Sequence, residues 1–193
     1  MTAHLVLASS SAYRRELLAR LRIGFEIDAA NIDETPLPGE SARDLVVRLA
    51  REKAAHVASR HQDAWVIGAD QVAVRDREIV GKPGSAARSV EQLRLASGQT
   101  LSFLTAVCVV SGRGERRDEH LDETRVKFRT LSATEIARYV EVERPYDCAG
   151  GFKSEGLGIS LFESIESRDP TALVGLPLIW LAGALRRAGL NVP

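Results

Sequence analysis

Asp70 is a residue whose type and position could do chemistry. It follows an apolar run from Ala64 to Ala69, which has the pattern of a strand buried on both faces. A carboxylate at that point is unfavourable unless it has a partner or a chemical task. Ligands of open α/β sheets collect at the carboxyl ends of strands, and this favours a functional role. The alternative is an Asp that caps the following turn, and the run alone leaves both interpretations open.

A serine-rich turn followed by arginines could bind an anion. The turn Ser9–Ser11 follows a predicted strand and supplies good N-cap residues for a predicted helix. Arg14 and Arg15 fall in the first turn of that helix, where cations oppose the helix dipole. A bound anion would reverse this effect, because it would meet backbone N–H groups, hydroxyl groups and guanidinium groups. Phosphate binding is therefore favoured over solvated arginines on an amphipathic helix.

Two lysines and a pair of carboxylates are weaker candidates. Asp33 and Glu34 lie in an acidic loop and offer the oxygen ligands that Mg²⁺ and Mn²⁺ prefer, although this pattern alone favours a solvated turn. Lys53 falls on the apolar stripe of a predicted helix, where its stem covers apolar surface or its ammonium meets phosphate oxygens. Lys82 lies between a glycine and a proline, and these neighbours fix its place in a loop.

The elements that must position these residues alternate between strands and helices. Strands are predicted at residues 4–8, 25–29, 64–69, 99–111, 119–129 and 159–165, with a hairpin between 72–74 and 78–80. Helices are predicted at 13–21, ended by Gly24, and at 41–61, 85–96, 132–142 and 175–189. This alternation predicts an α/β fold, and the lack of a linker or repeat predicts a single domain over residues 1–193.

Composition argues against several function classes. The 193 residues include 26 Lys and Arg against 26 Asp and Glu, a balance that disfavours a nucleic-acid polymer or a membrane surface as partner. Cys108 and Cys148 stand far apart and the 4 histidines lack metal spacing, so neither a disulfide framework nor a zinc site is expected. No apolar run approaches the ~18 residues of a membrane span, and no signal-peptide pattern is visible, so the expected location is the cytoplasm. Walker A and dinucleotide-binding glycine patterns are both missing.

Short motifs occur in order along nearly the whole chain. They are Leu7-Ala8-Ser9-Ser10-Ser11-x-x-Arg14-Arg15, Asp33-Glu34-Thr35, Arg48-Leu49-Ala50-x-x-Lys53-Ala54, Gly68-Ala69-Asp70-Gln71-Val72, Gly81-Lys82-Pro83 and Val174-Gly175-Leu176-Pro177-Leu178. Together they resemble the Maf family of nucleoside triphosphate pyrophosphatases. Two further segments, Cys148-Ala149-Gly150-x-Phe152-Lys153-Ser154-Glu155-Gly156-x-Gly158-Ile159 and Arg168-Asp169-Pro170, resemble its YceF-type branch, which is associated with 7-methyl-GTP. The chain departs from the family at Ala12, Gly151 and Ser167, where Pro, Ser and Gly are usual.

The resemblance implies a fold, a reaction and a cofactor. The implied fold is a mixed twisted sheet in two lobes with a central cleft, like that of inosine triphosphate pyrophosphatases (the Maf/Ham1 fold), and family members are often homodimers. The implied reaction hydrolyses a small-molecule nucleotide between its α and β phosphates and gives a nucleoside monophosphate and pyrophosphate. A divalent cation, Mg²⁺ or Mn²⁺, is implied as cofactor.

The resemblance also assigns roles to individual residues. Asp70 matches the proton acceptor and, with Glu34, the metal ligands. The phosphate-binding positions match Ser9, Arg14, Arg15, Lys53 and Lys82. Positions tied to substrate choice match Tyr13, Gln71 and Glu155. A carboxylate at 155 could accept N–H groups of 7-methylguanine, and an aromatic ring at 13 could stack on that cationic base.

Other functions remain open at the level of sequence. A pyrimidine pyrophosphatase of the same family, acting on dTTP or UTP, is the alternative enzyme. A nucleotide-binding regulator of cell division or septum formation is the alternative of a different class. The set of charged residues argues against a purely binding module, because binding needs no general base.

Overall fold

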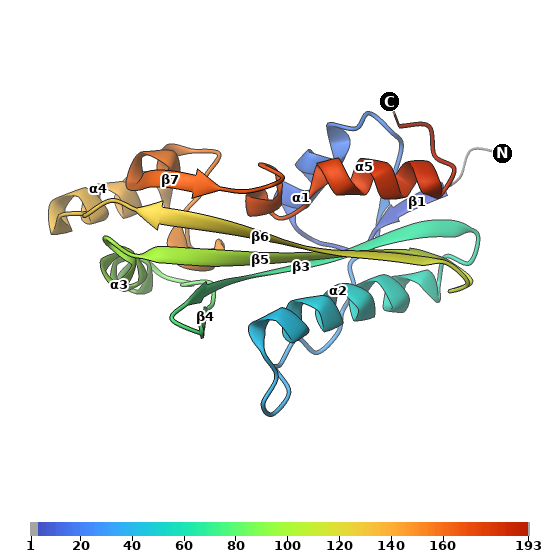
Figure 1. Ribbon diagram of the computed structural model, residues 1–193, viewed down its shortest axis with the longest axis horizontal. Helices are drawn as coiled ribbons and strands as arrows, with labels where there is room; N and C mark the ends of the chain where they lie inside the picture. Colours follow the sequence, from blue (N-terminus) through green and yellow to red (C-terminus); the bar gives the residue numbers. More distant parts are fainter. Residues whose placement is uncertain (1–3, 193) are drawn as a thin grey trace. The chain divides into compact units, whose positions relative to one another are not determined.

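The fold is a mixed α/β arrangement, seen in a computed structural model that describes residues 4–192 (Figure 1). Over these residues, seven strands form one sheet in the order β2-β1-β3-β5-β6-β7, and β4 pairs with β3. The strands are β1 (His4–Leu7), β2 (Glu26–Ile27), β3 (Ala64–Arg75), β4 (Glu78–Val80), β5 (Thr100–Ser111), β6 (Arg117–Phe128) and β7 (Phe162–Glu166). The helices are α1 (Ala12–Ala19), α2 (Ala42–Ala58), α3 (Ala86–Ala96), α4 (Ala133–Glu143), α5 (Leu178–Arg187) and the 3₁₀ helices η1 (Ala149–Gly151), η2 (Leu157–Leu161) and η3 (Ala172–Val174). The predicted α/β fold is confirmed.

The chain groups into two compact units. The first contains the described residues up to Asp70, together with Thr105–Asp122 and the chain from Asp169 onward. The second contains Gln71–Leu104 and Glu123–Arg168. Boundaries fall within β3, β5 and β6, so neither unit is a continuous stretch of sequence.

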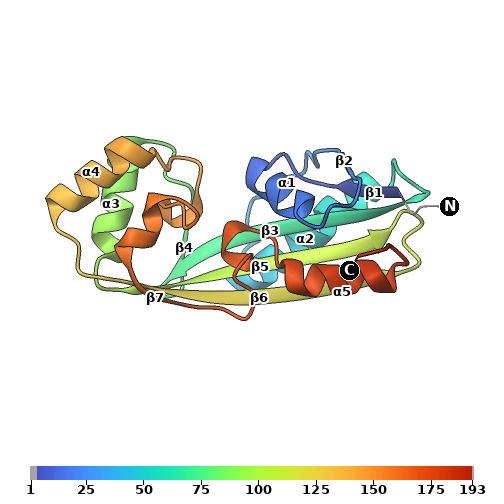
Figure 2. The same cartoon turned by 90° about the horizontal axis from the view of Figure 1, so that it is seen from above.

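Parallel pairing organises the first unit. β1 pairs in parallel with β2, where Val6 lies opposite Glu26, and with β3, where Leu7 lies opposite Ile67. α1 and α5 lie on one face of these strands and α2 lies on the other (Figure 1, Figure 2). The core on the α1 and α5 side contains Leu5, Leu7, Leu17, Leu18, Ile67, Val107, Leu181 and Leu185. Coverage of both faces explains why β3 begins as a continuous apolar run.

The backbones of α2 and β3 approach closely at Gly68. A Cβ at this position would collide with the carbonyl oxygen of Ala50 and would lie 2.5 Å from the backbone nitrogen of Ala54. Glycine therefore allows the helix to lie directly against the strand. Gly68 and Asp70 face the same side of β3, because side chains alternate along a strand. The close approach thus brings α2, with Lys53, over the part of β3 that contains Asp70.

Asp70 does not lie at a strand end, so that part of the sequence interpretation is wrong. β3 continues beyond it to Arg75. The neighbouring β1 is shorter and ends at Leu7, whose partner on β3 is Ile67. Asp70 therefore lies beyond the carboxyl end of β1, next to the start of the serine-rich turn. Ligands collect at the carboxyl ends of strands, and the strand whose carboxyl end lies near Asp70 is β1, not β3.

The second unit contains a hairpin, packed helices and an aromatic cluster. The predicted hairpin is confirmed, because β3 and β4 pair antiparallel with Ala73 opposite Val80. α3 packs against α4, whose start is fixed by a capping box between Ser132 and Glu135. Edge-to-face contacts join the rings of Phe103, Phe128, Phe152 and Phe162. These contacts bury the base of the glycine-rich segment around residue 152.

Some predicted boundaries are wrong at surface segments. The left-handed residue after α1 is Arg22, with φ 54°, rather than Gly24. The strand predicted at 25–29 contains only β2, whose two residues are exposed. The strand predicted at 159–165 is instead η2 followed by β7. Exposed segments bury little apolar area, so alternation of residue types does not fix their structure there.

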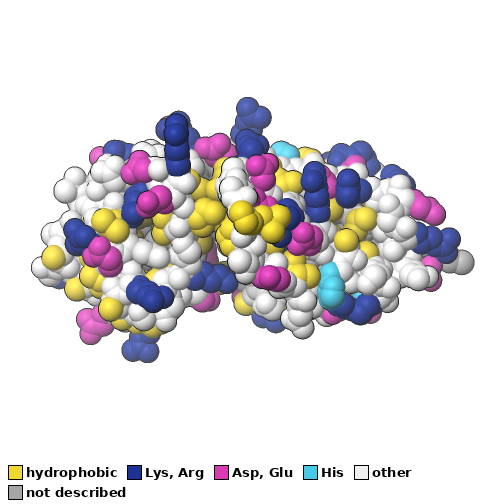
Figure 3. Space-filling model, turned by 90° about the horizontal axis from the view of Figure 1, so that it is seen from below, with side chains coloured by type: hydrophobic (Ala, Val, Ile, Leu, Met, Phe, Trp, Pro, Cys, Tyr) yellow, Lys and Arg dark blue, Asp and Glu magenta, His cyan; other side chains and the backbone are white. Residues whose placement is uncertain are grey.

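Charges of both signs are interspersed on the surface. Figure 3, viewed from the side on which α2 lies, shows acidic and basic side chains intermixed. This agrees with the formal net charge of zero. No helix within residues 4–192 is long and apolar enough to cross a membrane.

Candidate active site

The serine-rich turn is held by hydrogen bonds from backbone N–H groups to its own serine hydroxyls. Ser11 is the N-cap of α1, and its hydroxyl accepts the N–H of Arg14 at 3.4 Å. Ser9 is buried, and its hydroxyl accepts the N–H of Ser11 at 3.2 Å. These bonds shape the short turn between the end of β1 at Leu7 and the start of α1 at Ala12.

Arg14 is partly buried and reaches from the start of α1 to the segment that precedes α5. Its Nε donates to the carbonyl oxygen of Gly175 at 3.0 Å, and its Nη1 lies 3.5 Å from the hydroxyl of Ser9. Burial lowers the pKa of Arg14, while the negative charges of Asp70 and Glu34 act in the opposite direction. The predicted anion-binding arginine therefore belongs to the same electrostatic cluster as both predicted metal ligands.

Lys53 joins the two carboxylates of this cluster. Its Nζ lies 2.7 Å from Asp70 Oδ1 and 2.8 Å from Glu34 Oε1. The side chains of Lys53 and Asp70 are only 8% and 9% exposed, whereas that of Glu34 is 56% exposed. The Lys53 ammonium, for which the sequence left two interpretations open, is thus a buried cation between an interior carboxylate and a surface carboxylate. Buried charges of this kind need such partners.

The environment of Asp70 changes its acidity in opposing ways. Burial raises the pKa of Asp70 above its usual range, and the nearby charge of Glu34 adds to this effect. The Lys53 and Arg14 charges lower the pKa of Asp70 again, but burial is the larger cause, so the pKa lies above its ordinary value. A raised pKa makes the ionised carboxylate a stronger base than an exposed Asp.

Glu34 and Asp70 could also hold a divalent cation. Both carboxylates already contact one cation, the Lys53 ammonium, and oxygen ligands suit Mg²⁺ and Mn²⁺. Among the described residues, no group of three or more His, Cys, Asp and Glu side chains is placed to hold a metal ion. The two carboxylates therefore fit a cation that takes its remaining ligands from water and substrate phosphates, as Mg²⁺ does.

Sequence reasoning missed the role of Arg48, which ties the acidic loop to α2. Its Nε and Nη2 donate to the two carboxylate oxygens of Glu40 at 2.7 and 2.8 Å, and Nη2 donates to the Thr35 carbonyl at 3.1 Å. The hydrogen bonds from Arg48 hold the pKa of Glu40 down to about 2. Because Thr35 follows Glu34, this contact helps to hold Glu34 beside Lys53. The sequence feature that could have indicated this role is an arginine on the same predicted helix as Lys53.

The remaining predicted residues of the first unit are less closely involved. Tyr13 lies in the first turn of α1 and is partly buried. Arg15 is exposed, and within residues 4–192 no hydrogen bond or ion pair of its side chain is present. The structure therefore gathers Ser9, Arg14, Glu34, Lys53 and Asp70, and leaves Arg15 at the surface.

Gln71, Lys82 and Glu155 belong to the second unit. Gln71 is partly buried on β3. Lys82 is exposed in a loop that is fixed on one side by a hydrogen bond from Gln92 to the Gly81 carbonyl at 3.0 Å. Glu155 is exposed on the glycine-rich segment and accepts the hydroxyl of the preceding serine at 3.2 Å.

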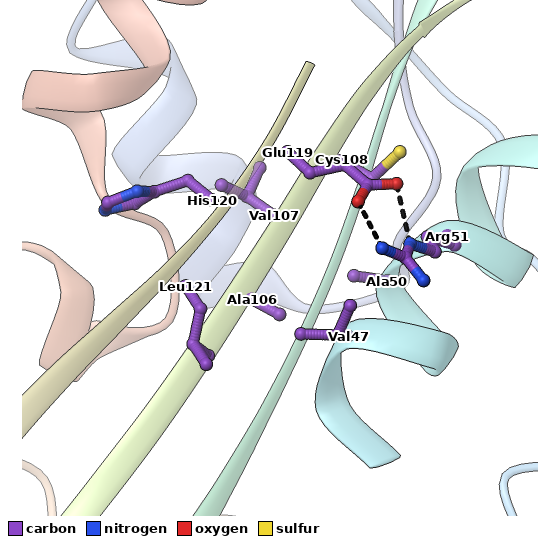
Figure 4. Close-up of a pocket in the computed structure, with 9 residues that line it drawn as sticks. All are labelled: Val47, Ala50, Arg51, Ala106, Val107, Cys108, Glu119, His120 and Leu121. Atoms are coloured by element: carbon purple, nitrogen blue, oxygen red, sulfur yellow. Dashed lines mark hydrogen bonds and ion pairs between the residues drawn. The ribbon is translucent and has the colours of Figure 1, made fainter. Parts of the chain in front are cut away.

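A separate hollow lies beside α2 in the first unit. It has a volume of about 200 Å³ and is lined by Val47, Ala50, Arg51, Ala106, Val107, Cys108, Glu119, His120 and Leu121 (Figure 4). Arg51 and Glu119 pair with each other through two hydrogen bonds of 2.7 and 2.6 Å. Burial raises the pKa of the Cys108 thiol to about 12, which keeps it protonated and unreactive. The Arg51 and Glu119 charges in the lining are thus paired with each other, and most of the remaining lining residues are apolar.

The fold class agrees with that of a solved structure. A structure described as a HAM1 protein from Coxiella burnetii matches 96% of this chain and 100% of its own chain, with a TM-score of 0.53. The two sequences are only 12% identical, so the likeness concerns the fold alone. The predicted Maf/Ham1 fold class is confirmed.

Sequence comparisons place the chain in a family. The family model described as Maf-like protein matches residues 4–188. A protein of Aromatoleum aromaticum named 7-methyl-GTP pyrophosphatase is 57% identical over 190 residues, covering 98% of this chain and 97% of that protein. A protein of the same name from Xanthomonas axonopodis pv. citri is 54% identical over 189 residues, covering 98% of each. This chain therefore belongs to the Maf family, as its motifs predicted.

Proposed function

We propose that this Maf-family protein is a nucleoside triphosphate pyrophosphatase that hydrolyses 7-methyl-GTP to 7-methyl-GMP and pyrophosphate. The observation that carries the proposal is the buried ion pair between Lys53 and Asp70, in one electrostatic cluster with Arg14. This cluster combines a carboxylate base with cations suited to phosphate oxygens. The names of the two relatives support 7-methyl-GTP as the substrate.

The residues of the cluster would divide the chemistry between them. Asp70 takes a proton from the water that attacks the α phosphorus, and the bond from that phosphorus to the bridging oxygen breaks as pyrophosphate leaves. Lys53 and Arg14 stabilise the negative charge that develops on the phosphate oxygens. The proposal includes three further phosphate ligands: the Ser9 hydroxyl, the Arg15 guanidinium and the Lys82 ammonium.

A divalent cation held by Glu34 and Asp70 is part of the proposal. Their two carboxylates supply the oxygen ligands that Mg²⁺ and Mn²⁺ prefer. When bound, the cation would neutralise negative charge on the substrate phosphates. Arg48 supports this arrangement, because it holds the acidic loop through Glu40 and the Thr35 carbonyl.

A nucleotide panel tests the proposed reaction. We expect pyrophosphate release with Mg²⁺ or Mn²⁺ to be fastest from 7-methyl-GTP, slower from GTP, dTTP and UTP, and absent after chelation of the metal. Faster turnover of dTTP or UTP would instead assign the chain to pyrimidine nucleotides. Nucleotide binding without release of pyrophosphate would favour the regulatory function.

Glu155 is proposed to select the nucleotide, together with Tyr13 and Gln71. Glu155→Gln removes a negative charge that suits the cationic 7-methylguanine base. We expect the ratio of kcat/KM for 7-methyl-GTP to that for UTP to fall about tenfold. A loss of this size corresponds to the free energy of one charge-assisted hydrogen bond. Glu163→Gln, at an exposed position of β7 in the same unit, is the matched control and should leave the ratio unchanged. An equal loss for both nucleotides would remove Glu155 from base selection.

Location and assembly complete the proposal. We propose that the protein acts in the cytoplasm and as a homodimer, both in keeping with the family resemblance. Light scattering of the purified protein would give the mass of the assembly, and a monomer mass would overturn the second statement.

A further inference from the structure

The segment Asp169–Pro177, directly before α5, supplies the carbonyl group that Arg14 binds. The carbonyl oxygen of Gly175 accepts the Nε–H of Arg14 at 3.0 Å. Gly175 has a φ of 122°, a conformation in which a side chain would be strained. A Cβ at Gly175 would also lie 3.5 Å from Arg14 Nε. The orientation of the Arg14 guanidinium therefore depends on the path of this segment.

Asp169 accepts hydrogen bonds from the chain on both sides of Gly175. It is 3% exposed. Its Oδ1 accepts the N–H of Thr171 at 2.9 Å, and its Oδ2 accepts the N–H of Ile179 in the first turn of α5 at 2.6 Å. Both carboxylate oxygens are thus used to hold backbone groups, one before and one after Gly175.

Thr171 joins the same two sides through its hydroxyl. Oγ1 lies 2.6 Å from Asp169 Oδ1 and 2.9 Å from the carbonyl oxygen of Leu176, either of which can accept its proton. The same Oγ1 accepts the N–H of Leu178 at 2.9 Å. Leu176 directly follows Gly175 and Leu178 comes two residues later, so the hydroxyl restrains the chain where it leaves this glycine.

We propose that Asp169 and Thr171 are positioning residues for Arg14. Their hydrogen bonds hold the Gly175 carbonyl in place, and the carbonyl directs the Arg14 guanidinium toward the phosphate groups of the substrate. The inference rests on the proposed function in that Arg14 binds the triphosphate. Asp169 is buried with both carboxylate oxygens bonded, and a polar group of this kind fixes the geometry of its surroundings.

Capping of α5 alone does not account for this arrangement. An N-terminal cap would explain the bond from the Ile179 N–H to Asp169. It would also explain why the Thr171 hydroxyl accepts the Leu178 N–H, but it would not explain the contact of that hydroxyl with the Leu176 carbonyl, which lies before α5 and next to Gly175. The turn presents its carbonyl to Arg14, on a different helix far away in the sequence.

A double-mutant cycle between Thr171 and Arg14 tests the inference. Thr171→Val keeps the shape of the side chain and removes the hydroxyl, and we expect kcat/KM for 7-methyl-GTP to fall about tenfold through misorientation of Arg14. Thr171→Ser restores the hydroxyl and should stay within about twofold of the original protein. In an Arg14→Ala background, Thr171→Val should change kcat/KM by less than about twofold, because the group that it positions is gone.

The same four proteins of the cycle should be compared by binding of inorganic triphosphate, measured by calorimetry without turnover. We expect the same non-additive pattern in the binding constants. Additive effects in both measurements would overturn the inference and leave Thr171 with a structural role only. A protein that binds triphosphate with the expected pattern but releases no pyrophosphate would overturn the proposed function and keep the inference.

A second substitution covers the case in which Thr171→Val does not fold. Asp169→Asn keeps one accepting oxygen and replaces the other with an NH₂ group, which cannot accept the second backbone N–H. We expect this variant to lose kcat/KM about tenfold in the original protein and by less than about twofold in the Arg14→Ala background. An equal loss in both backgrounds would count against the positioning role.

Discussion

Asp70→Asn is expected to lower kcat for pyrophosphate release by about 10³-fold, within the range for loss of a general base. Asparagine has nearly the same shape but cannot take a proton from water. The variant should still fold, because Lys53 keeps Glu34 as a partner at 2.8 Å. The measurement is steady-state release of pyrophosphate from 7-methyl-GTP, with circular dichroism as the check on folding.

Asp63→Asn is the matched control for this substitution. It makes the same chemical change in the same unit, at a side chain that is 91% exposed and pairs with Arg113 at the surface. We expect its kcat to stay within about twofold of the original protein, since exposed ion pairs contribute little. If Asp70→Asn retained a tenth or more of the original kcat, another group would be the base.

Lys53→Met is expected to have the largest effect on stability. Methionine fills a similar volume but leaves Asp70 and Glu34 without their shared cation. Removing one partner of a buried ion pair typically costs about 3 kcal/mol in the free energy of unfolding. Chemical denaturation followed by circular dichroism measures this loss. We expect activity to fall as well, because Lys53 is also a proposed phosphate ligand.

The pH dependence of Lys53→Met gives a second measurement. The Lys53 charge lowers the pKa of Asp70, so its removal should raise that pKa further above the ordinary value of 3.8. A carboxyl group with a raised pKa in the folded state contributes stability below its unfolded pKa, and this is lost as pH rises through the folded value. The deficit of Lys53→Met should therefore be smallest at acidic pH and grow toward neutral pH.

The double substitution Lys53→Met with Asp70→Asn is the control for stability. It removes both members of the Lys53–Asp70 ion pair, so neither of these two charges is left without the other. We expect its free energy of unfolding to lie within about 1 kcal/mol of the original protein, because neutral replacement of a buried pair is often tolerated. A double variant as unstable as Lys53→Met alone would show that packing, rather than charge, dominates at this position.

The sequence predicted the elements with strong patterns. β3, β5 and α2 are long and apolar on the faces they bury, and all of them occur near the predicted ranges. Predictions failed at the short segments β2 and η2. These segments bury little apolar surface, so the pattern of residue types does not select strand over helix there. The hairpin formed by β3 and β4 was predictable because its turn lies between two strand patterns.

The sequence by itself determined which residue types this protein brings to its chemistry. Serines, arginines, lysines and a carboxylate after an apolar run predicted a site for phosphate, and the order of the motifs predicted the Maf family. These conclusions depend only on local patterns and on resemblance, so they needed no knowledge of long-range contacts.

Only the tertiary structure decided how these residues meet. Lys53 lies between Asp70 and Glu34 because Gly68 allows α2 to lie directly against β3. Arg14 binds a carbonyl at Gly175, on a segment far from it in the sequence. Asp70 lies beyond the early carboxyl end of β1 rather than at the end of its own strand. Each of these facts depends on packing between distant segments, which no local pattern of residues contains.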